Sequence, residues 1–205
     1  DTIAAMERAL PRAAALLPPA AAFGAVGYAC TSGATLIGAA RVAELVRGAT
    51  GAATVTDPLS AAVAALDAVG ARSVSIVSPY IEPVAEPIRR AFETAGFEVP
   101  AAFSFGEAVE ARVARIDAAS VRDAARDAAA AGADAIFLSC TNLRTLAVID
   151  GLEAELRRPI LSSNQVLAWH MARLGGAALA ETAPGTLSSR PMSRLPHGPR
   201  ESLRR

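Results

Sequence analysis

The chain has 205 residues, of which 52% are hydrophobic and 20% charged, a composition typical of a soluble globular protein with one substantial core or two smaller ones. Twenty basic residues balance twenty acidic ones, and this neutral, dispersed charge argues against a surface that binds nucleic acid or an acidic membrane. Every basic residue is Arg, which excludes mechanisms that need a Lys, such as a Schiff base or a P-loop.

The apolar runs are interrupted by Arg, Glu, Pro or Gly, so none reaches the roughly 18 residues that a membrane-spanning helix needs. The sequence also shows no basic-then-apolar leader. From both features we expect a cytoplasmic protein.

Helical and extended patterns alternate along the chain. Apolar residues at helical spacing predict a first helix over 2–17, with Pro11 inside it. Apolar runs then predict extended segments at 23–29, 53–56, 72–77, 97–105, 133–139 and 159–162. Helices are predicted between and after them at 34–46, 58–69, 82–95, 120–131, 145–157 and 164–174, while 107–117 fits neither pattern.

Capping residues set the expected boundaries. Asp57 and Ser120 are suited to cap the helices that follow them, and Gly48 is suited to end the helix before it. Pro100 suggests that 97–105 lies at a sheet edge. The alternation predicts an α/β fold of parallel sheets covered by helices, in two arrays of similar size. From residue 183 onward, scattered Pro, Ser, Gly and Arg predict a flexible tail over 183–205.

The only two cysteines, Cys30 and Cys140, each follow a predicted buried strand and precede a predicted helix. Functional groups in open α/β sheets gather at the carboxyl ends of strands, where helix N–H groups and the helix dipole would stabilise a thiolate. A single cysteine would be interpreted as a small buried hydrophobe, and a disulfide is a second alternative, although it is rare in a reducing compartment. The repeated placement favours a pair of reactive thiols. His170 and His197 lack metal-ligand spacing, so no metal site is predicted.

Small polar residues directly follow both cysteines, namely Thr31, Ser32, Thr141 and Asn142. Such residues commonly cap helices, but here their donors can also form a cradle for a carboxylate or an enolate. Tyr80 follows another strand and could aim its phenol at the same place, with ordinary packing as the alternative.

Other polar or aromatic residues near these segments have simpler interpretations. Asn164 and Gln165 are expected to cap a helix, Trp169 to lie in the core, and His170 to lie on a partly exposed helix face. Arg144 could reach a carboxylate, although a solvated Arg is the usual case.

Four segments of the chain resemble the aspartate/glutamate racemase superfamily. They are Cys30-Thr31-Ser32-Gly33, Ser78-Pro79-Tyr80, the run from Ser139 to Thr145 and Leu161-Ser162-Ser163-Asn164-Gln165. The chain is most similar to the branch of maleate cis-trans isomerase and arylmalonate decarboxylase, and within it to the ectoine-utilisation protein EutA. The likeness covers residues 22–174.

This resemblance implies two Rossmann-like parallel-sheet domains with pseudo-twofold symmetry and an inter-domain cleft. We expect residues 1–70 with 163–180 in the first domain, without its first strand, and 71–162 in the second. The resemblance implies catalytic roles for Cys30 and Cys140, a carboxylate-binding role for Thr31, Ser32, Tyr80 and the Thr141 backbone, and no cofactor.

The decarboxylase of this branch keeps only the second cysteine, so two cysteines favour an isomerase or racemase acting on a small carboxylate or amino-acid-derived substrate. The isomerases also carry a substrate-binding Asn where this chain has residues 107–115, and no Asn is present there. An arylmalonate-type decarboxylase and an inactive carboxylate-binding relative are the alternatives. Ala-rich and Leu-rich helix faces would permit a homo-oligomer.

Overall fold

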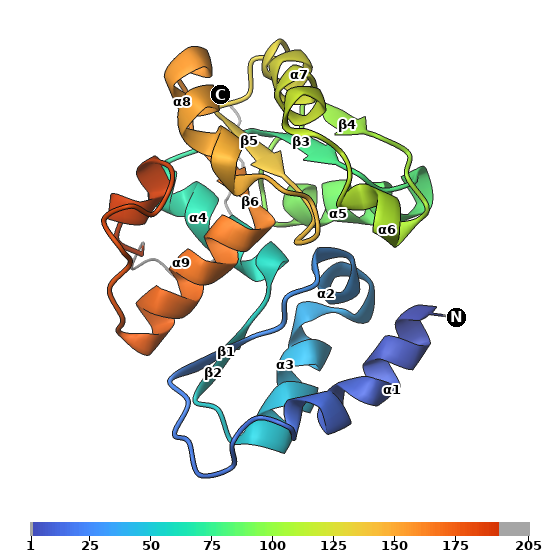
Figure 1. Ribbon diagram of the computed structural model, residues 1–205, viewed down its shortest axis with the longest axis vertical. Helices are drawn as coiled ribbons and strands as arrows, with labels where there is room; N and C mark the ends of the chain where they lie inside the picture. The colour runs from blue at the N-terminus through green and yellow to red at the C-terminus, as the bar shows by residue number, and fades with distance from the viewer. Residues whose placement is uncertain (1, 193–205) are drawn as a thin grey trace, which may run out of the picture.

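A computed structural model describes residues 2–192 and contains two parallel β-sheets flanked by helices (Figure 1). The strands are β1 (Ala25–Gly27), β2 (Thr54–Thr56), β3 (Val74–Ser78), β4 (Ala102–Ser104), β5 (Ala135–Leu138) and β6 (Ile160–Ser162). The α-helices are α1 (Thr2–Ala14), α2 (Thr31–Ile37), α3 (Ala39–Thr50), α4 (Pro58–Val69), α5 (Glu82–Thr94), α6 (Glu110–Val113), α7 (Ala118–Ala129), α8 (Ile149–Leu156) and α9 (Ser163–Gly175). Two short 3₁₀ helices, η1 (Leu146–Val148) and η2 (Thr186–Ser189), complete the set.

The strands form two separate sheets, one of β1 and β2 and one in the order β4-β3-β5-β6. All neighbouring strands run parallel, which confirms the predicted α/β class. The outer strand β4 is exposed along its length, in agreement with the edge position that Pro100 suggested. The carboxyl ends of the strands in each sheet therefore point the same way, which gathers the residues that follow them.

One pattern of strands, cysteine turn and helix occurs in both sheets. β1 leads to Cys30 and pairs with β2, which leads into α4; β5 leads to Cys140 and pairs with β6, which leads into α9. The two cysteines therefore occupy corresponding positions in a repeated unit.

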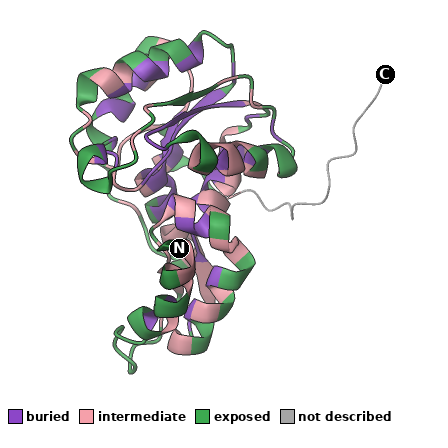
Figure 2. Ribbon diagram, turned by 90° about the vertical axis from the view of Figure 1, so that its right-hand side faces the viewer, coloured by how far each residue is buried: buried purple, intermediate pink, exposed green. Residues whose placement is uncertain are grey.

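The four-stranded sheet holds most of the core. Residues of β3, β5 and β6 are buried throughout, and Phe92 packs edge-on against Phe137 with ring centroids 5.2 Å apart. The two-stranded sheet has a smaller core, in which Leu10 and Ala14 of α1 meet Val42 and Val46 of α3. Figure 2 shows the difference, with buried residues concentrated in the larger sheet.

Helix α9 connects the two halves of the molecule. It packs against α4, β6 and β1, and in Figure 1 it reaches from the larger sheet toward the smaller one. Trp169 of α9 is buried in the larger core, as predicted. Because α4 and α9 contact elements of both halves, the division into 1–70 with 163–180 and 71–162 stays a prediction.

Several predicted boundaries were wrong for local reasons. The expected helix over 34–46 is two helices that break at Gly38, where φ is +95°, and the second continues past Gly48 to Gly51, where φ is +65°. Helix α7 is capped by Asp117, whose carboxylate accepts the N–H of Ser120, so Ser120 is not the cap. Residues 107–117 contain the short helix α6.

The first part of the predicted tail packs against the rest of the structure. Leu187 of η2 is buried, and the Trp169 indole donates a hydrogen bond to the Arg190 carbonyl at 3.0 Å. This part of the chain therefore packs on α9, and 193–205 lies outside the described residues. Within residues 2–192, no helix is both long enough and apolar enough to cross a membrane.

The buried cap of α4 gives a test of the fold. Asp57 is 2% exposed and accepts the N–H groups of Leu59 at 2.8 Å and Ser60 at 3.0 Å. Replacing Asp57 with Ala removes this buried acceptor and leaves two partly buried N–H groups without it. We expect Asp57→Ala to lower the free energy of unfolding by about 1–2 kcal/mol in urea melts. Asp117→Ala, which removes an exposed cap, should cost less because water replaces the carboxylate. Equal losses would contradict this account.

Candidate active site

Cys30 lies at the start of a helix, as the sequence predicted. It is the N-cap residue of α2, and its Sγ accepts the backbone N–H of Gly33 at 3.3 Å. The hydroxyl of Ser32 is 3.7 Å from the same sulfur. The side chain is only partly buried. Cys30 is thus an accessible thiol with two polar neighbours from its own turn.

Cys140 has a different environment from the one predicted. Its Sγ accepts the N–H of Asn142 at 3.4 Å, but the next regular helix begins only at η1, so the donor belongs to a turn and no helix dipole reaches the sulfur. Burial raises the pKa of the Cys140 thiol more than the hydrogen bonds from Tyr80 and the Asn142 N–H lower it, and the negative charge of Glu110 adds a smaller rise. The expectation of a dipole-stabilised thiolate was therefore wrong at Cys140, whose environment favours the protonated thiol.

The backbone of Cys140 is unusual because φ is +96°, a value that L-residues rarely adopt. Such conformations persist only where surrounding contacts hold them, and they occur often at functional sites. The buried N–H of Cys140 donates to the hydroxyl of Ser163 at 3.0 Å. This contact ties the turn after β5 to the first residue of α9.

Hydrogen bonds join the residues beside the two cysteines. Thr141 Oγ1 donates to the carbonyl of Ala29 at 3.0 Å, and Thr31 Oγ1 lies 2.9 Å from Ser163 Oγ. Ala29 and Thr31 flank Cys30, whereas Thr141 follows Cys140. The structure therefore brings the two sequence-distant cysteine turns together.

Tyr80 follows β3 and lies between these turns. Its side chain is 8% exposed, and burial is the main reason that its pKa is raised. The charge of Cys140 and a hydrogen bond to it raise this pKa further, as does the charge of Cys30, whereas a hydrogen bond from Thr31 opposes the rise. The phenol therefore keeps its proton and lies within electrostatic reach of both sulfurs.

Asn142 contributes differently from the prediction. Its side-chain amide donates to the carboxylate of Glu110 at 2.7 Å and to the Glu110 carbonyl at 3.0 Å, so this side chain holds α6 against the turn. Its backbone N–H is the group that meets Cys140 Sγ. Asn142 thereby connects the charge of Glu110 to the cysteine turn.

Two other predicted roles were also tested. Asn164 donates to the Thr141 carbonyl at 2.9 Å and is not the cap of α9. Ser162 is that cap, and Gln165 completes the capping box as predicted. Arg144 is exposed, and its charge acts on Asp117.

Sequence reasoning missed three neighbours of the cysteines: Tyr28, Glu110 and Ser163. A Cβ built at Gly33 would collide with the phenol oxygen of Tyr28 and lie 3.1 Å from Cys30 Sγ, so a larger residue there would displace the Tyr28 phenol. Burial, followed by the charge of Cys30, raises the pKa of Tyr28 to about 12. The signal for Tyr28 was available, since this aromatic hydroxyl directly follows β1, two residues before Cys30.

Metal ligands do not gather in the described part of the chain, where no three His, Cys, Asp or Glu side chains form a cluster. His170 is partly buried, and its Nδ1 lies 2.8 Å from Thr56 Oγ1. Burial lowers the pKa of His170, which favours the neutral ring.

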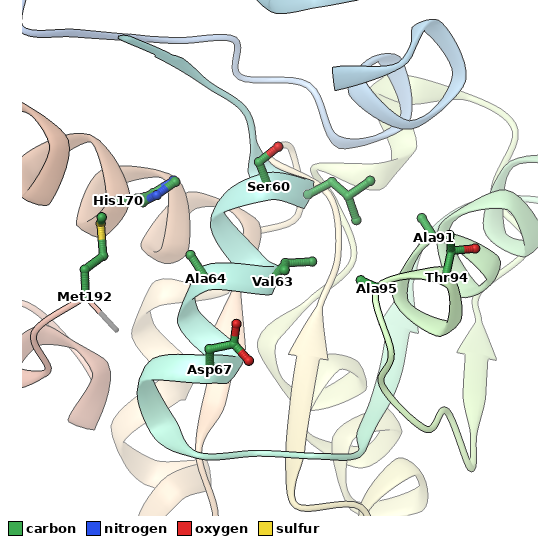
Figure 3. Close-up of a pocket in the computed structure, with 10 residues that line it drawn as sticks. Ser60, Val63, Ala64, Asp67, Ala91, Thr94, Ala95, His170 and Met192 are labelled. Atoms are coloured by element: carbon green, nitrogen blue, oxygen red, sulfur yellow. The ribbon is translucent and has the colours of Figure 1, made fainter. Parts of the chain in front are cut away.

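A pocket of about 540 Å³ between α4, α5 and α9 is a rival site (Figure 3). His170, Asp67, Ser60 and Met192 are among its lining residues. It contains neither cysteine and no other strong nucleophile, so the cysteine turns remain the better candidate for covalent or proton-transfer chemistry.

Comparisons with known proteins identify relatives of the chain. A sequence model of the arylmalonate decarboxylase family matches residues 8–188. The arylmalonate decarboxylase of Bordetella bronchiseptica is 33% identical over 122 residues, which cover 58% of this chain and 50% of that protein. The maleate isomerase of Nocardia farcinica is 29% identical over 147 residues, or 71% of this chain and 59% of that protein. The chain thus spans little more than half the length of these curated relatives.

Solved structures show the same relationship. The crystal structure of the maleate isomerase Iso from Pseudomonas putida S16 gives a TM-score of 0.84 at 26% identity, with 91% of this chain and 78% of that chain covered. A Nocardia farcinica maleate cis-trans isomerase with a covalently bound succinylcysteine intermediate gives 0.82 at 28% identity, with 91% and 79% covered.

The charge of Glu110 gives a prediction for this site. A nearby carboxylate disfavours the Cys140 thiolate, so Glu110→Gln, which keeps an acceptor for Asn142, should lower the pKa of Cys140. The thiolate should then form at lower pH in an ultraviolet titration of a variant that also carries Cys30→Ala. The matched control is Glu107→Gln, on the same segment, whose carboxylate accepts the Val109 N–H at 2.8 Å. An unchanged or raised midpoint for Glu110→Gln would refute the assignment.

Proposed function

We propose, from the premise that this chain belongs to the arylmalonate decarboxylase family, that its two cysteines isomerise or racemise a small carboxylate without a cofactor. The observation that carries the proposal is the set of hydrogen bonds joining the turns of Cys30 and Cys140, with Tyr80 in reach of both sulfurs. Two thiols held this way can act on one small molecule from different sides.

Different environments suggest different roles for the two thiols. Burial raises the pKa of Cys140, so this thiol suits the proton donor. Cys30 is more accessible and receives the Gly33 N–H on its sulfur, so it suits the base or nucleophile. Tyr80 keeps its phenolic proton and can donate to a carboxylate oxygen or to the sulfur of Cys140.

In a cis-trans isomerisation, the Cys30 thiolate adds to a carbon of the double bond, and the electron pair moves toward the neighbouring carboxylate. The Cys140 thiol gives its proton to that carbanion, and the new single bond rotates. Cys140 then removes the proton again, and the Cys30–carbon bond breaks to restore the double bond. The succinylcysteine in a related maleate isomerase supports the addition step.

In a racemisation, one thiolate removes the proton next to the carboxylate, and the other thiol returns a proton to the opposite face. Both reactions create negative charge on the carboxylate. The hydroxyl group of Ser32, the backbone at Thr31 and Thr141, and Tyr80 are the groups that we assign to hold it. A reaction on an amino-acid derivative, of the kind that the resemblance to EutA implies, would use the same two thiols and the same carboxylate-holding groups.

Arylmalonate-type decarboxylation is the second candidate, because a curated decarboxylase is among the similar proteins. That reaction loses one carboxylate as carbon dioxide and returns one proton, so it requires only one thiol. The presence of Cys30 beside Cys140 favours the two-thiol reactions. A binding protein that has lost catalysis would keep ligand affinity when both cysteines are changed.

The proposal predicts that both cysteines are required. Cys30→Ala and Cys140→Ala should each lower kcat by about 100-fold or more, because each removes a group that transfers a proton or forms a bond. The assay follows maleate and chiral amino acids in deuterated water by NMR: fumarate indicates isomerisation, and deuterium next to the carboxylate indicates racemisation.

Thermal melts with each ligand provide the control for folding and binding. Turnover that survives both substitutions would overturn the proposal. Carbon dioxide release from an arylmalonate that depends on Cys140 but not on Cys30 would favour the decarboxylase.

A further inference from the structure

Ser163 is a buried residue that contacts both cysteine turns. It is the first residue of α9, it is fully buried, and its hydroxyl meets the N–H of Cys140 at 3.0 Å and Thr31 Oγ1 at 2.9 Å. Thr141, which belongs to the Cys140 turn, also reaches the Cys30 turn through the Ala29 carbonyl. Ser163 bridges the two thiol-bearing halves with a single oxygen.

The direction of these hydrogen bonds follows from the backbone. The Cys140 N–H can only donate, so Ser163 Oγ accepts there and its own proton is free for Thr31 Oγ1. Thr31 can then donate to the Tyr80 phenol, with which it shares a hydrogen bond, and Tyr80 can donate to Cys140 Sγ. These four residues can therefore form a closed circuit of hydrogen bonds, which starts at the observed contacts of Ser163 with the Cys140 N–H and Thr31 Oγ1 and returns through Tyr80 to the Cys140 sulfur.

This circuit restrains Cys140 at two points. One is its backbone, where φ is +96° and the buried N–H has Ser163 as its partner. The other is its sulfur, toward which the circuit directs the Tyr80 proton. Removing the Ser163 hydroxyl would free the backbone and would remove the donor that orients Thr31.

We propose that Ser163 is a positioning residue, which fixes the Cys140 backbone and orients the Thr31–Tyr80 hydrogen bonds toward the Cys140 sulfur. The inference rests on the proposed function, because it concerns how the second thiol is held for proton transfer. Ser163 does not touch the substrate in this account and acts only through its neighbours.

The charged and titratable groups near Cys140 come from three elements. Tyr80 follows β3, Glu110 lies on α6, and Cys30 caps α2. The Ser163→Ala substitution removes none of these three groups. A change in the Cys140 titration would therefore reflect the lost orientation of Tyr80 rather than a lost charge.

The test titrates the Cys140 thiolate by ultraviolet absorbance in a full-length Cys30→Ala background, where one thiol remains, and subtracts a variant without cysteines. Adding Ser163→Ala should move the midpoint to higher pH, because the thiolate loses an oriented donor. In the two-cysteine protein, Ser163→Ala should lower kcat about tenfold or more with little change in KM.

Ser162→Ala is the matched control. Ser162 is equally buried and caps the same helix. Its hydroxyl accepts the N–H of Gln165 at 3.4 Å and does not contact the cysteine turns. It should lower stability without moving the midpoint. Thr31→Val, which breaks the next link and leaves the Ser163–Cys140 contact in place, should raise the midpoint and provides the test if Ser163→Ala does not fold.

An unchanged midpoint in Ser163→Ala, or in Thr31→Val if the first variant does not fold, would overturn the proposal. An equal shift in Ser162→Ala would also overturn it, because the effect would then be one of general destabilisation. The titration uses no substrate, so it decides the role of Ser163 even if the protein proves to catalyse neither proposed reaction.

Discussion

Hydrogen bonds between the turn of Cys30 and the turn of Cys140 are the interaction on which this structure depends. Thr141 reaches the carbonyl of Ala29, and Ser163 connects Thr31 to the backbone of Cys140. The Thr141–Ala29 and Thr31–Ser163 contacts are 3.0 Å and 2.9 Å long, and each joins residues more than 100 positions apart in the chain. Without them the cysteines would belong to two unrelated strand ends.

The fold makes this meeting possible through its repeated connection. In each half a strand delivers a cysteine at its carboxyl end and pairs with a strand that leads into a helix. Because parallel strands direct their carboxyl ends to one edge, each sheet presents its cysteine at the junction of the halves. Helix α9 then spans the junction, with Ser163 at its first position and Trp169 anchored in the larger core.

Much of this could be predicted from the sequence, because the signals are local. Apolar runs located the strands, Asp57 identified a helix start, and the two strand–Cys–Thr units indicated a paired site. The environment of Cys140 could not be predicted, since its burial and its positive φ depend on β6, α6 and α9. Ser163 and Glu110 were missed for the same reason: one resembled a helix-cap residue, and the other lay in a segment without clear periodicity.

The central claim is that both thiols can reach one small molecule, and a three-carbon bis-electrophile such as dichloroacetone tests it most directly. The account predicts that a single reagent molecule bridges Cys30 and Cys140 within one chain, which intact mass and peptide mapping would detect, and that a bound small carboxylate slows the bridging. Separate modification of the two cysteines by two reagent molecules, with no bridge, would contradict the account.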